Sequence, residues 1–423
     1  MNDTILEDYS NITDLEKFIQ EGKNSANLRD FQDSKKVLHH MKNVYDLWKT
    51  GDAKPVHMTI GFTNYCQHKC PWCYINWQQS GRTSLRSGNG ELKRKAINAD
   101  DRLIEAVGEA VDMGLKAVTI VGDGEPTLHK KFINYIEKLK SMNLDIGLFT
   151  NMAFKKDEIL EAIIQNVFFL RISLDSANKE YHDMTHGNND FDNVIENIKK
   201  AVDLRKDKKF PIIGIQYVTN QDNYKDLANA AKLYKSLGVD YMTIKPQLKN
   251  ELNPNHKDNT LKFKDAYKYM REAENFEDKN FKVYAKYSMF VEILGRTYNN
   301  GTYYKKCVAT PLSPYLDEDG NVEMCGNLKG RGFTMGNIYK NSFYEIWNSN
   351  QRKSCLDKID LKKCPVGCKL DPLNKTLTDL LKETKLGDSN KADGDYLRFQ
   401  TEKKKKYKEV LESKKEKIHT NFI

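Results

Sequence analysis

Residues 101–121 read DRLIEAVGEAVDMGLKAVTIV and join a helical pattern directly to a strand pattern. The first part repeats apolar side chains at steps of three and four residues, at Ile104, Val107 and Val111, which predicts an amphipathic helix. The second part, KAVTIV from Lys116, is short and rich in β-branched residues, which predicts a buried strand. A helix followed at once by a buried strand is typical of a βαβ unit, in which crossover helices join parallel strands.

The same alternation continues from residue 56 to about residue 245. Six strand-then-helix repeats predict an α/β fold with parallel strands, either an open or closed β/α barrel or a doubly wound sheet. In each of these folds ligands bind at the carboxyl ends of the strands, so polar residues that follow a strand are candidates for a site. The other predicted strands are VHMTIGF from Val56, DIGLFT from Asp145, FFLRISL from Phe168, IIGIQYV from Ile212 and YMTIK from Tyr241. The other predicted helices span residues 129–142, 155–166, 190–206 and 222–237.

The composition predicts a globular chain, since 39% of the 423 residues are hydrophobic, 30% are charged and only 10 are Pro. No apolar run approaches the roughly 18 residues that a membrane span needs. The start, MNDTILEDYSN, is acidic where a secretory signal would be basic, so we expect a cytoplasmic protein. Of the net charge of +9, residues 401–418 supply +4, and no basic stripe favours nucleic acid as a partner.

Changes of composition along the chain predict five segments. We expect a helical N-terminal extension at residues 1–55, a core barrel at 56–250, a bridging region at 251–300, a small cysteine-rich domain at 301–372 and a Lys-rich tail at 373–423. The bridging region is rich in Asn, Lys and Tyr, and the tail is expected either as a Lys-rich helix or as a disordered segment.

The eight Cys fall into two groups, at positions 66, 70 and 73 and at positions 307, 325, 355, 364 and 368. Eight Cys are too few for a disulfide framework in a chain of this length, and without a signal peptide the compartment is reducing. The grouping therefore predicts two metal sites.

Cys66, Cys70 and Cys73 place three thiols on the loop after the first predicted strand. Thiolate favours zinc, copper or iron and sulfur, and three ligands leave a fourth coordination position. A structural zinc would close that position with His68 or His57, whereas a reactive iron–sulfur cluster would keep one iron open. The spacing by itself leaves both interpretations open.

The loop resembles the signature of the radical S-adenosylmethionine (SAM) superfamily, in which an aromatic residue precedes the last of three Cys. Cys66, Cys70 and Cys73 match the spacing, and Trp72 supplies the aromatic residue. The resemblance implies a partial (β/α)6 TIM-like barrel with a [4Fe-4S] cluster, whose open iron chelates SAM and whose electron releases a 5′-deoxyadenosyl radical. It also implies that Trp72 packs near the adenine and that the backbone of Tyr74 contacts the adenine edge.

Polar residues at later strand ends fit the same resemblance. GDGEP at residues 122–126 resembles the family motif for the methionine amino group, with Asp123 as a departure inside the glycine pair. Glycine suits that role because its backbone can approach a ligand without a Cβ in the way. Thr150 and Asn151 are either SAM contacts or a strand-end turn. The resemblance implies amino-group contacts from Gly122, Gly124 and Glu125, ribose and carboxylate contacts from Ser173 and Asp175, and a fifth-strand contact from Gln216.

The second group begins with Cys-x12-Gly-x4-Cys, formed by Cys307, Gly320 and Cys325. This spacing resembles the opening of the SPASM and Twitch extensions, which carry auxiliary iron–sulfur clusters in the superfamily. Residues 319–321, Asp-Gly-Asn, predict a tight hairpin turn that brings strands bearing the two Cys together.

Cys364 and Cys368 would complete a four-thiolate site with the first two Cys of this group. Five Cys suit the one-cluster Twitch form, which implies a second, auxiliary [4Fe-4S] cluster. A structural zinc is the alternative, since four thiolates also satisfy zinc. Cys355 is interpreted as a free thiol, or as a substitute for one of the two later ligands.

The resemblance implies an enzyme that removes a hydrogen atom from a substrate carbon. We expect the oxidation (dehydrogenation) or epimerisation of a polar small molecule, such as a sugar, a cyclitol or a nucleotide-linked sugar, with a flavodoxin or ferredoxin as reducing partner. Lys245, at the end of the sixth predicted strand, is the candidate catalytic residue as a substrate contact, with a salt bridge as its alternative role. The alternative functions are a peptide- or protein-maturing enzyme and a non-catalytic metal-binding scaffold or electron carrier.

Overall fold

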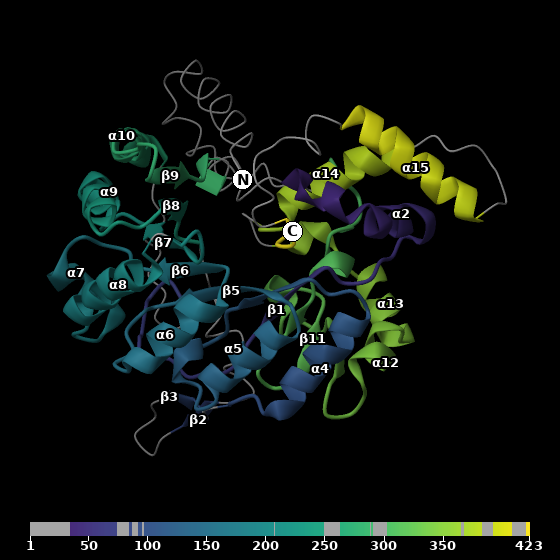
Figure 1. Ribbon diagram of the computed structural model, residues 1–423, viewed down its shortest axis with the longest axis horizontal. Helices are drawn as coiled ribbons and strands as arrows, with labels where there is room; N and C mark the ends of the chain where they lie inside the picture. The colour runs from purple at the N-terminus through teal and green to yellow at the C-terminus, as the bar shows by residue number, and fades with distance from the viewer. Residues whose placement is uncertain are drawn as a thin grey trace.

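The computed structural model describes residues 34–73, 84–86, 92–94, 97–206, 208–248, 263–287, 289–290, 303–364, 368–382, 392–407 and 420–423. These residues build one ten-stranded sheet with helices packed against it, together with a separate two-stranded sheet (Figure 1). Within the described ranges, no helix has the length and apolar character required to cross a membrane.

Seven parallel strands, in the order β1-β4-β5-β6-β7-β8-β9, form the barrel part of the large sheet. The sheet ends at β9 and does not close, which confirms the expected partial barrel. The seven strands are β1 (His57–Ile60), β4 (Ala117–Ile120), β5 (Asp145–Thr150), β6 (Phe169–Ser173), β7 (Ile212–Thr219), β8 (Tyr241–Pro246) and β9 (Lys282–Ala285). The first six are the predicted strands. The structure adds β9, whose short alternation FKVYAK lies inside the region expected only to bridge two domains.

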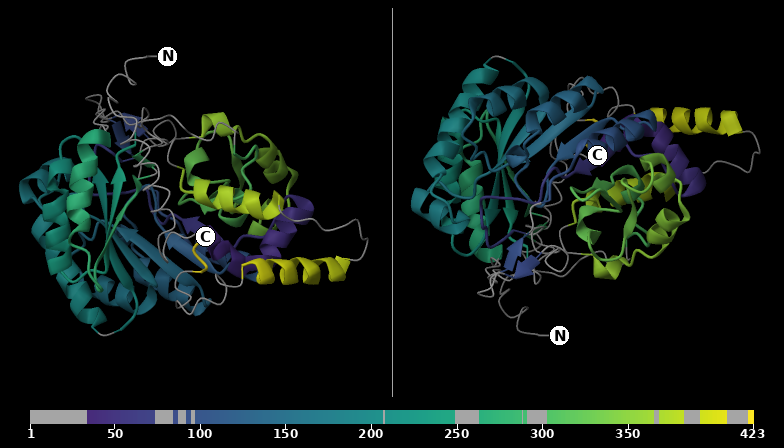
Figure 2. Two further views of the ribbon diagram at one scale, coloured as in Figure 1. Left: turned by 90° about the horizontal axis from the view of Figure 1, so that it is seen from above. Right: turned by 90° about the horizontal axis from the view of Figure 1, so that it is seen from below.

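Helices cover the outer side of the barrel strands (Figure 2). The five predicted helices are present as α4 (Asp101–Asp112), α5 (Phe132–Ser141), α6 (Asp157–Asn166), α8 (Phe191–Arg205) and α9 (Leu227–Ser236). Asp100 caps helix α4, because its side chain accepts a hydrogen bond from the backbone N–H of Arg102, and the helix buries Leu103 and Val107 in the core. Helices α7 (Lys179–His186) and α10 (Phe263–Glu274) were not predicted.

The inner side of the barrel is the more polar and more accessible side. In β7, Ile213, Ile215 and Tyr217 are fully buried, whereas the intervening Gln216 is partly accessible, as the two-residue period of a strand requires. Gly214 lies on the inner side, where the ring of Tyr241 covers it and a Cβ would come within 2.0 Å of that ring. We therefore expect the strand residues that contact a ligand to be those whose side chains face the inside of the barrel.

The C-terminal region continues the same sheet. Strand β10 (Tyr315–Leu316) pairs in parallel with β1, and β11 (Asn321–Glu323) and β12 (Thr334–Asn337) follow antiparallel. The predicted turn is present, since Gly320 has φ +78° and the Asp317 carboxylate accepts a hydrogen bond from the backbone N–H of Asn321. Cys325 follows β11, but Cys307 precedes the short helix η5 (Thr310–Leu312) and lies in no strand, which differs from the expected pair of Cys-bearing strands.

Helices and the chain end complete the C-terminal part. The helices are α12 (Phe343–Trp347), α13 (Asn350–Asp357), α14 (Asp371–Lys382) and α15 (Ala392–Lys406). The remaining short elements are η2 (Ser34–His40), η3 (Pro126–Leu128), η4 (Tyr224–Asp226), η6 (Gly326–Leu328) and η7 (Leu361–Lys363), and β2 (Ser84–Arg86) pairs with β3 (Leu92–Arg94). Helix α15 packs on α2 (Met41–Thr50) through Phe399 and Tyr45, whose ring centroids lie 5.5 Å apart. Phe422 packs against Phe169 at 4.9 Å between ring centroids, so the chain end lies near the start of β6.

Candidate active site

The loop that carries the first three Cys leaves the carboxyl end of β1 and is fixed by hydrogen bonds. The hydroxyl of Thr63 donates to the carbonyl of Ile97 at 3.0 Å, and the side-chain oxygen of Asn64 accepts from the Ile97 N–H at 2.8 Å. Within the loop, the N–H of Cys73 donates to the carbonyl of Cys70 at 3.1 Å and forms a turn. The three thiols therefore extend from a loop held at its base, and none of them is in a disulfide.

The thiols have different electrostatic surroundings. Burial raises the pKa of Cys66, and the neighbouring Glu125 and Cys70 raise it further because they disfavour another negative charge. Burial also opposes ionisation of Cys70, but the charges and hydrogen bonds of His186 and His68 outweigh it and lower the pKa to about 6. A thiolate is the form that binds metal, so the loop already favours it at Cys70.

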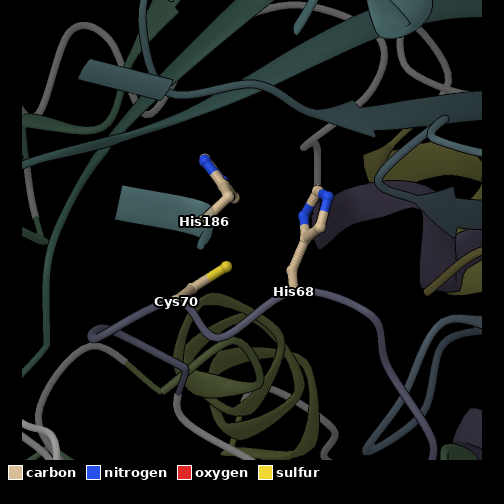
Figure 3. Close-up of side chains that lie close together, drawn as sticks. All are labelled: His68, Cys70 and His186. Carbon is tan, nitrogen blue, oxygen red and sulfur yellow. The ribbon is translucent and has the colours of Figure 1, made fainter. Parts of the chain in front are cut away.

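Two histidines flank Cys70, and carboxylates hold both of them. In Figure 3 the sulfur of Cys70 points between the imidazole rings of His68 and His186. Nε2 of His68 lies 2.8 Å from Oδ2 of Asp190, and Nε2 of His186 lies 3.6 Å from Oδ2 of Asp175. Since the carboxylates orient the rings, the two histidines keep fixed positions beside the Cys70 sulfur.

The same three side chains offer a compact set of metal donors. The donor atoms of His68, Cys70 and His186 all lie within 4.8 Å of one another, a separation that suits a single ion such as zinc. That arrangement would leave Cys66 and Cys73 without a role. His57 does not take part, because its two ring nitrogens lie 3.0 Å from Ser313 Oγ and 2.8 Å from Thr119 Oγ1 at the other end of β1.

The GDGEP segment packs directly under the Cys loop. The N–H of Glu125 donates to the carbonyl of Tyr65 at 2.8 Å. A Cβ on Gly124 would lie 2.1 Å from that same carbonyl oxygen, so only glycine allows the two backbones to approach this closely. Asp123 is buried, and its carboxylate lies 3.1 Å from the ammonium group of Lys329 in the C-terminal region. An ion pair therefore satisfies the residue that departs from the family motif.

Glu125 connects this segment to the end of β5. Its carboxylate accepts hydrogen bonds from Thr150 Oγ1 and from the backbone N–H of Asn151, both at 2.7 Å. The side-chain amide of Asn151 lies 3.9 Å from Cys66 Sγ. Thr150 also accepts from the N–H of Met152 at 3.0 Å, which is a strand-end turn. The structure thus brings together the predicted residues of two strand ends and the first Cys, while their contacts to SAM stay a prediction.

The predicted residues of β6 and β7 lie side by side on the inner face of the barrel. Ser173 pairs in register with Gln216, and the carboxylate of Asp175 accepts a hydrogen bond from the backbone N–H of Val218. Trp72 packs edge-on against His186, with 5.6 Å between ring centroids. Tyr74 lies outside the described residues.

Lys245 lies on β8 and is partly accessible at the carboxyl rim of the barrel. Burial lowers its pKa to about 8, although Asp175 partly opposes this shift. Within the described part of the chain the side-chain amine of Lys245 forms neither an ion pair nor a hydrogen bond, so the alternative role in a salt bridge finds no support there. His182, His186 and Asp190 were not predicted as residues of this site. The signal in the sequence is KEYHDMTH, where two His four residues apart predict a shared helix face.

Four Cys of the second group lie near one another. Cys307 and Cys368 both raise the pKa of Cys325, after burial as the main cause, and Cys307 also raises that of Cys364. Asn374 on α14 donates to the Cys307 sulfur at 3.3 Å. These contacts and mutual influences bring the four predicted ligands into one group, while ligation itself stays a prediction.

Cys355 lies apart from this group, on α13. Its sulfur lies 3.7 Å from the carbonyl oxygen of Thr334 and 3.8 Å from the amide of Gln351. Burial raises the pKa of its thiol, which suits a neutral, inert Cys. These contacts agree with its interpretation as a free thiol.

The spacing of the thiols tests what each group can hold. No three Cys sulfurs of the described residues lie within 4.8 Å of one another. A zinc ion with Zn–S bonds of about 2.3 Å would hold its sulfurs closer than that, at about 3.8 Å. As they stand, the described thiols are therefore not arranged around a single zinc ion, and a cubane iron–sulfur cluster is another group that thiolates bind.

Comparison with known families agrees with this chemistry. Residues 60–229 match the family described as Radical SAM superfamily, and residues 307–369 match the SPASM family, described as an iron–sulfur cluster-binding domain. Residues 60–229 thus form a radical SAM domain, and residues 307–369 form a C-terminal auxiliary domain of the SPASM type. These assignments imply a [4Fe-4S] cluster with SAM in the barrel and auxiliary iron–sulfur binding in the C-terminal domain.

The curated relatives are distant. One is the tungsten-containing aldehyde ferredoxin oxidoreductase cofactor-modifying protein of Pyrococcus furiosus, 26% identical over 191 residues, which are 44% of this chain and 50% of the relative. Another is the probable GTP 3′,8-cyclase of Pyrococcus horikoshii, 25% identical over 202 residues, which are 47% of this chain and 60% of the relative. This chain thus spans about half the length of the curated relatives that it matches.

Solved structures share the fold. SuiB of Streptococcus suis bound to S-adenosylmethionine has a TM-score of 0.58 at 15% identity, with 88% of this chain and 85% of that chain covered. SuiB bound to its precursor peptide SuiA has a TM-score of 0.57 at 16% identity, with 82% and 77% covered. At this identity the likeness concerns the fold alone.

Proposed function

We propose that this protein cleaves SAM reductively and uses the resulting radical to remove a hydrogen atom from a substrate carbon. The observation that carries the proposal is Asn151, which contacts both Glu125 and the Cys66 sulfur. It links the loop of three thiols to the two strand ends expected to hold SAM. A structural zinc site or an electron carrier does not require a contact between the Cys loop and the strand ends expected to bind SAM.

Each part of the site has a proposed role. A [4Fe-4S] cluster on Cys66, Cys70 and Cys73 would supply the single electron that cleaves bound SAM. Gly124 and Glu125 lie close beneath the Cys loop, where they would hold the methionine end of SAM. Ser173, Asp175 and Gln216 face the barrel interior from β6 and β7, where they would hold the ribose and the carboxylate, and Trp72 would pack near the adenine.

The second group of thiols would hold one auxiliary [4Fe-4S] cluster. Cys307, Cys325, Cys364 and Cys368 are proposed as its ligands because they influence one another electrostatically and fall within the residues that match the iron–sulfur cluster-binding domain. An auxiliary cluster can accept an electron from a substrate radical, which suits a dehydrogenation. We further propose a flavodoxin or ferredoxin as the electron donor.

The proposed substrate is a polar small molecule, such as a sugar, a cyclitol or a nucleotide-linked sugar, which the enzyme oxidises or epimerises. This proposal is supported by the polar inner face of the barrel, where Gln216, Ser173 and Lys245 are partly accessible. The relative from Pyrococcus horikoshii is named for a nucleotide substrate, whereas SuiB was solved with a peptide. A peptide is therefore the alternative that the experiments have to test.

Anaerobic reconstitution tests the central proposal. Two cubane clusters give about eight irons per chain, and one gives about four. Reduction with dithionite in the presence of SAM should then release 5′-deoxyadenosine, whereas an electron carrier would release none. Cys70→Ser should abolish the release, and Cys355→Ser is the matched control that should preserve it. Colourless, oxygen-protected protein filled with zinc would refute the proposal.

Turnover in D2O distinguishes the two reactions. A dehydrogenation lowers the product mass by two hydrogens, whereas an epimerisation leaves the elemental composition unchanged and adds one deuterium when an exchangeable group returns the hydrogen. Parallel incubations use a small-metabolite extract and a peptide fraction, both prepared from cells of the organism that makes this protein. They show whether a small molecule or a peptide is converted. Conversion of peptides alone would refute the small-molecule proposal and leave SAM cleavage intact.

A further inference from the structure

Three cationic side chains face the barrel interior from the part of the sheet between β6 and β9. Lys245 is on β8, and Lys286 directly follows β9, where its N–H donates to the carbonyl of Ile244 at 2.9 Å. Since Ile244 pairs with Ala285, the next residues, Lys245 and Lys286, stand side by side on the inner face. Arg171 faces inward from β6, two strands away from β8.

Aromatic rings position Arg171. Its Nε donates to the hydroxyl of Tyr241 at 3.1 Å, and its guanidinium carbon lies 4.9 Å from the ring centroid of Phe149. Gly214 makes room for this arrangement, because the Tyr241 ring lies where its Cβ would be. The guanidinium group stays charged at every physiological pH. Arg171 is close enough to both amines to lower their pKa values.

The two lysines are short of negative charge. Among the residues that the structure describes, the side-chain amine of neither Lys245 nor Lys286 forms an ion pair or a hydrogen bond. Burial, together with repulsion from Arg171 and Lys245, lowers the pKa of Lys286 to about 7. Asp175 is the acid whose charge raises the pKa of Lys245.

A purely structural role does not explain the two amines. Buried lysines in a core are normally paired with carboxylates, and an unpaired amine destabilises the fold compared with an apolar residue of similar size. Both side chains are nevertheless partly accessible, so solvent and small solutes can reach them. Groups that lower the stability of a fold while facing a site commonly serve ligand binding.

We propose that Arg171, Lys245 and Lys286 bind an anionic group of the substrate, a phosphate or a carboxylate. An anion would supply the missing charge, and the planar guanidinium group suits two oxygens of one such group. The inference rests on the proposed function only in calling the ligand a substrate. Asp175 lies near Lys245 and 3.6 Å from His186, so the anion site adjoins the expected radical site across the barrel.

The test is binding of probe anions to anaerobically reconstituted enzyme without SAM. Isothermal titration with inorganic phosphate, pyrophosphate and acetate at low ionic strength compares phosphate with carboxylate. Wild-type enzyme should bind at least one probe, and Lys245→Met and Lys286→Met should each weaken binding at least tenfold. Lys286→Arg should retain binding because it keeps the charge. Lys340→Met removes an exposed, distant charge and should match wild type.

A second measurement needs no variant. Brief acetylation with acetic anhydride and mass spectrometry reports the accessibility of each lysine. Saturating pyrophosphate or acetate, whichever binds, should protect Lys245 and Lys286 but not Lys340. Lack of binding by wild type, or equal effects of the probe on all three lysines, would overturn the proposal.

Failure of this inference can be distinguished from failure of the proposed function. Wild-type enzyme that releases 5′-deoxyadenosine but binds no probe anion would refute only the anion site. Enzyme that binds the probe through the two lysines but never cleaves SAM would refute only the radical chemistry.

Discussion

Replacing Lys329 by Met should destabilise the protein, because Lys329 is a buried cation with three acidic neighbours. Its ammonium group lies 3.1 Å from Asp123 and 3.4 Å from both Asp317 and Glu318. The side chain of Lys329 is 1% exposed, so water cannot replace it. The variant would leave carboxylates buried without a counter-charge, and one of them belongs to the GDGEP segment.

The magnitude follows from the geometry. A pair of unit charges about 3.3 Å apart interacts with about 5 kcal/mol at an effective dielectric constant near 20. Desolvation and repulsion among the carboxylates oppose this attraction, and loss of one partner from a buried pair costs about 3–5 kcal/mol. With an unfolding entropy of about 2.1 cal/mol/K per residue, a chain of this length has about 0.9 kcal/mol/K. A loss of about 4 kcal/mol should therefore lower Tm by about 4–5 °C.

The assay is thermal unfolding of reconstituted wild type and variants, followed by circular dichroism. Lys340→Met, an exposed lysine of the same domain, should change Tm by less than about 1 °C. The double variant Lys329→Met/Asp123→Asn should recover part of the loss, because one unpaired carboxylate is removed. A Tm for Lys329→Met within 1 °C of wild type would refute the reasoning about this ion network.

Three further predictions concern single residues. Gly124→Ala should reduce release of 5′-deoxyadenosine at least tenfold, because the new Cβ would lie 2.1 Å from the Tyr65 carbonyl oxygen. Gly108→Ala is the control and should have little effect, since the atom nearest to its new Cβ is a flexible methyl at 3.6 Å. Equal activities of the two variants would contradict this prediction. Burial raises the folded-state pKa of Glu318 from 4.5 to about 8, so the folded state binds more protons and its stability falls as pH rises through that window. Glu318→Gln cannot lose stability through this titration, so the Tm of the variant minus the Tm of wild type should increase from pH 5 to pH 8. A Tm difference that stays constant with pH would argue against the prediction. Cys355→Ser should keep the iron and sulfide content of wild type, and loss of one cluster's iron would make Cys355 a ligand.

The barrel was predictable because its strands and helices carry complete periodic patterns. Residues 145–150 form a short, mainly apolar run between Asp145 and Thr150, and β5 has those same bounds. Strand β9 was missed because Lys282 and Lys286 interrupt its apolar residues, and because α10 before it follows a stretch without clear periodicity. Local pattern is a weak signal for such a strand, which is held by its pairing with β8.

The candidate site was predictable where its residues share a motif and not where the fold assembles them. The three Cys and GDGEP are contiguous in sequence, so their spacing carries information. Asp123, by contrast, meets Lys329 from 206 residues away, and His68 meets Asp190 from 122 residues away. No local pattern predicts such a pairing, because it depends on how the C-terminal region and α7 pack against the barrel.

Strand β1 ties the two proposed metal centres into one framework. Its backbone donates hydrogen bonds to Pro314 and Leu316 from Thr59 and Gly61, while its other edge pairs with β4. A shortened protein that ended before residue 303 would expose this edge and the apolar surface beside it, and would be prone to aggregate. The shared strand also keeps both halves at a constant separation, so electron exchange between the centres would depend on their relative redox potentials and not on one half swinging toward the other.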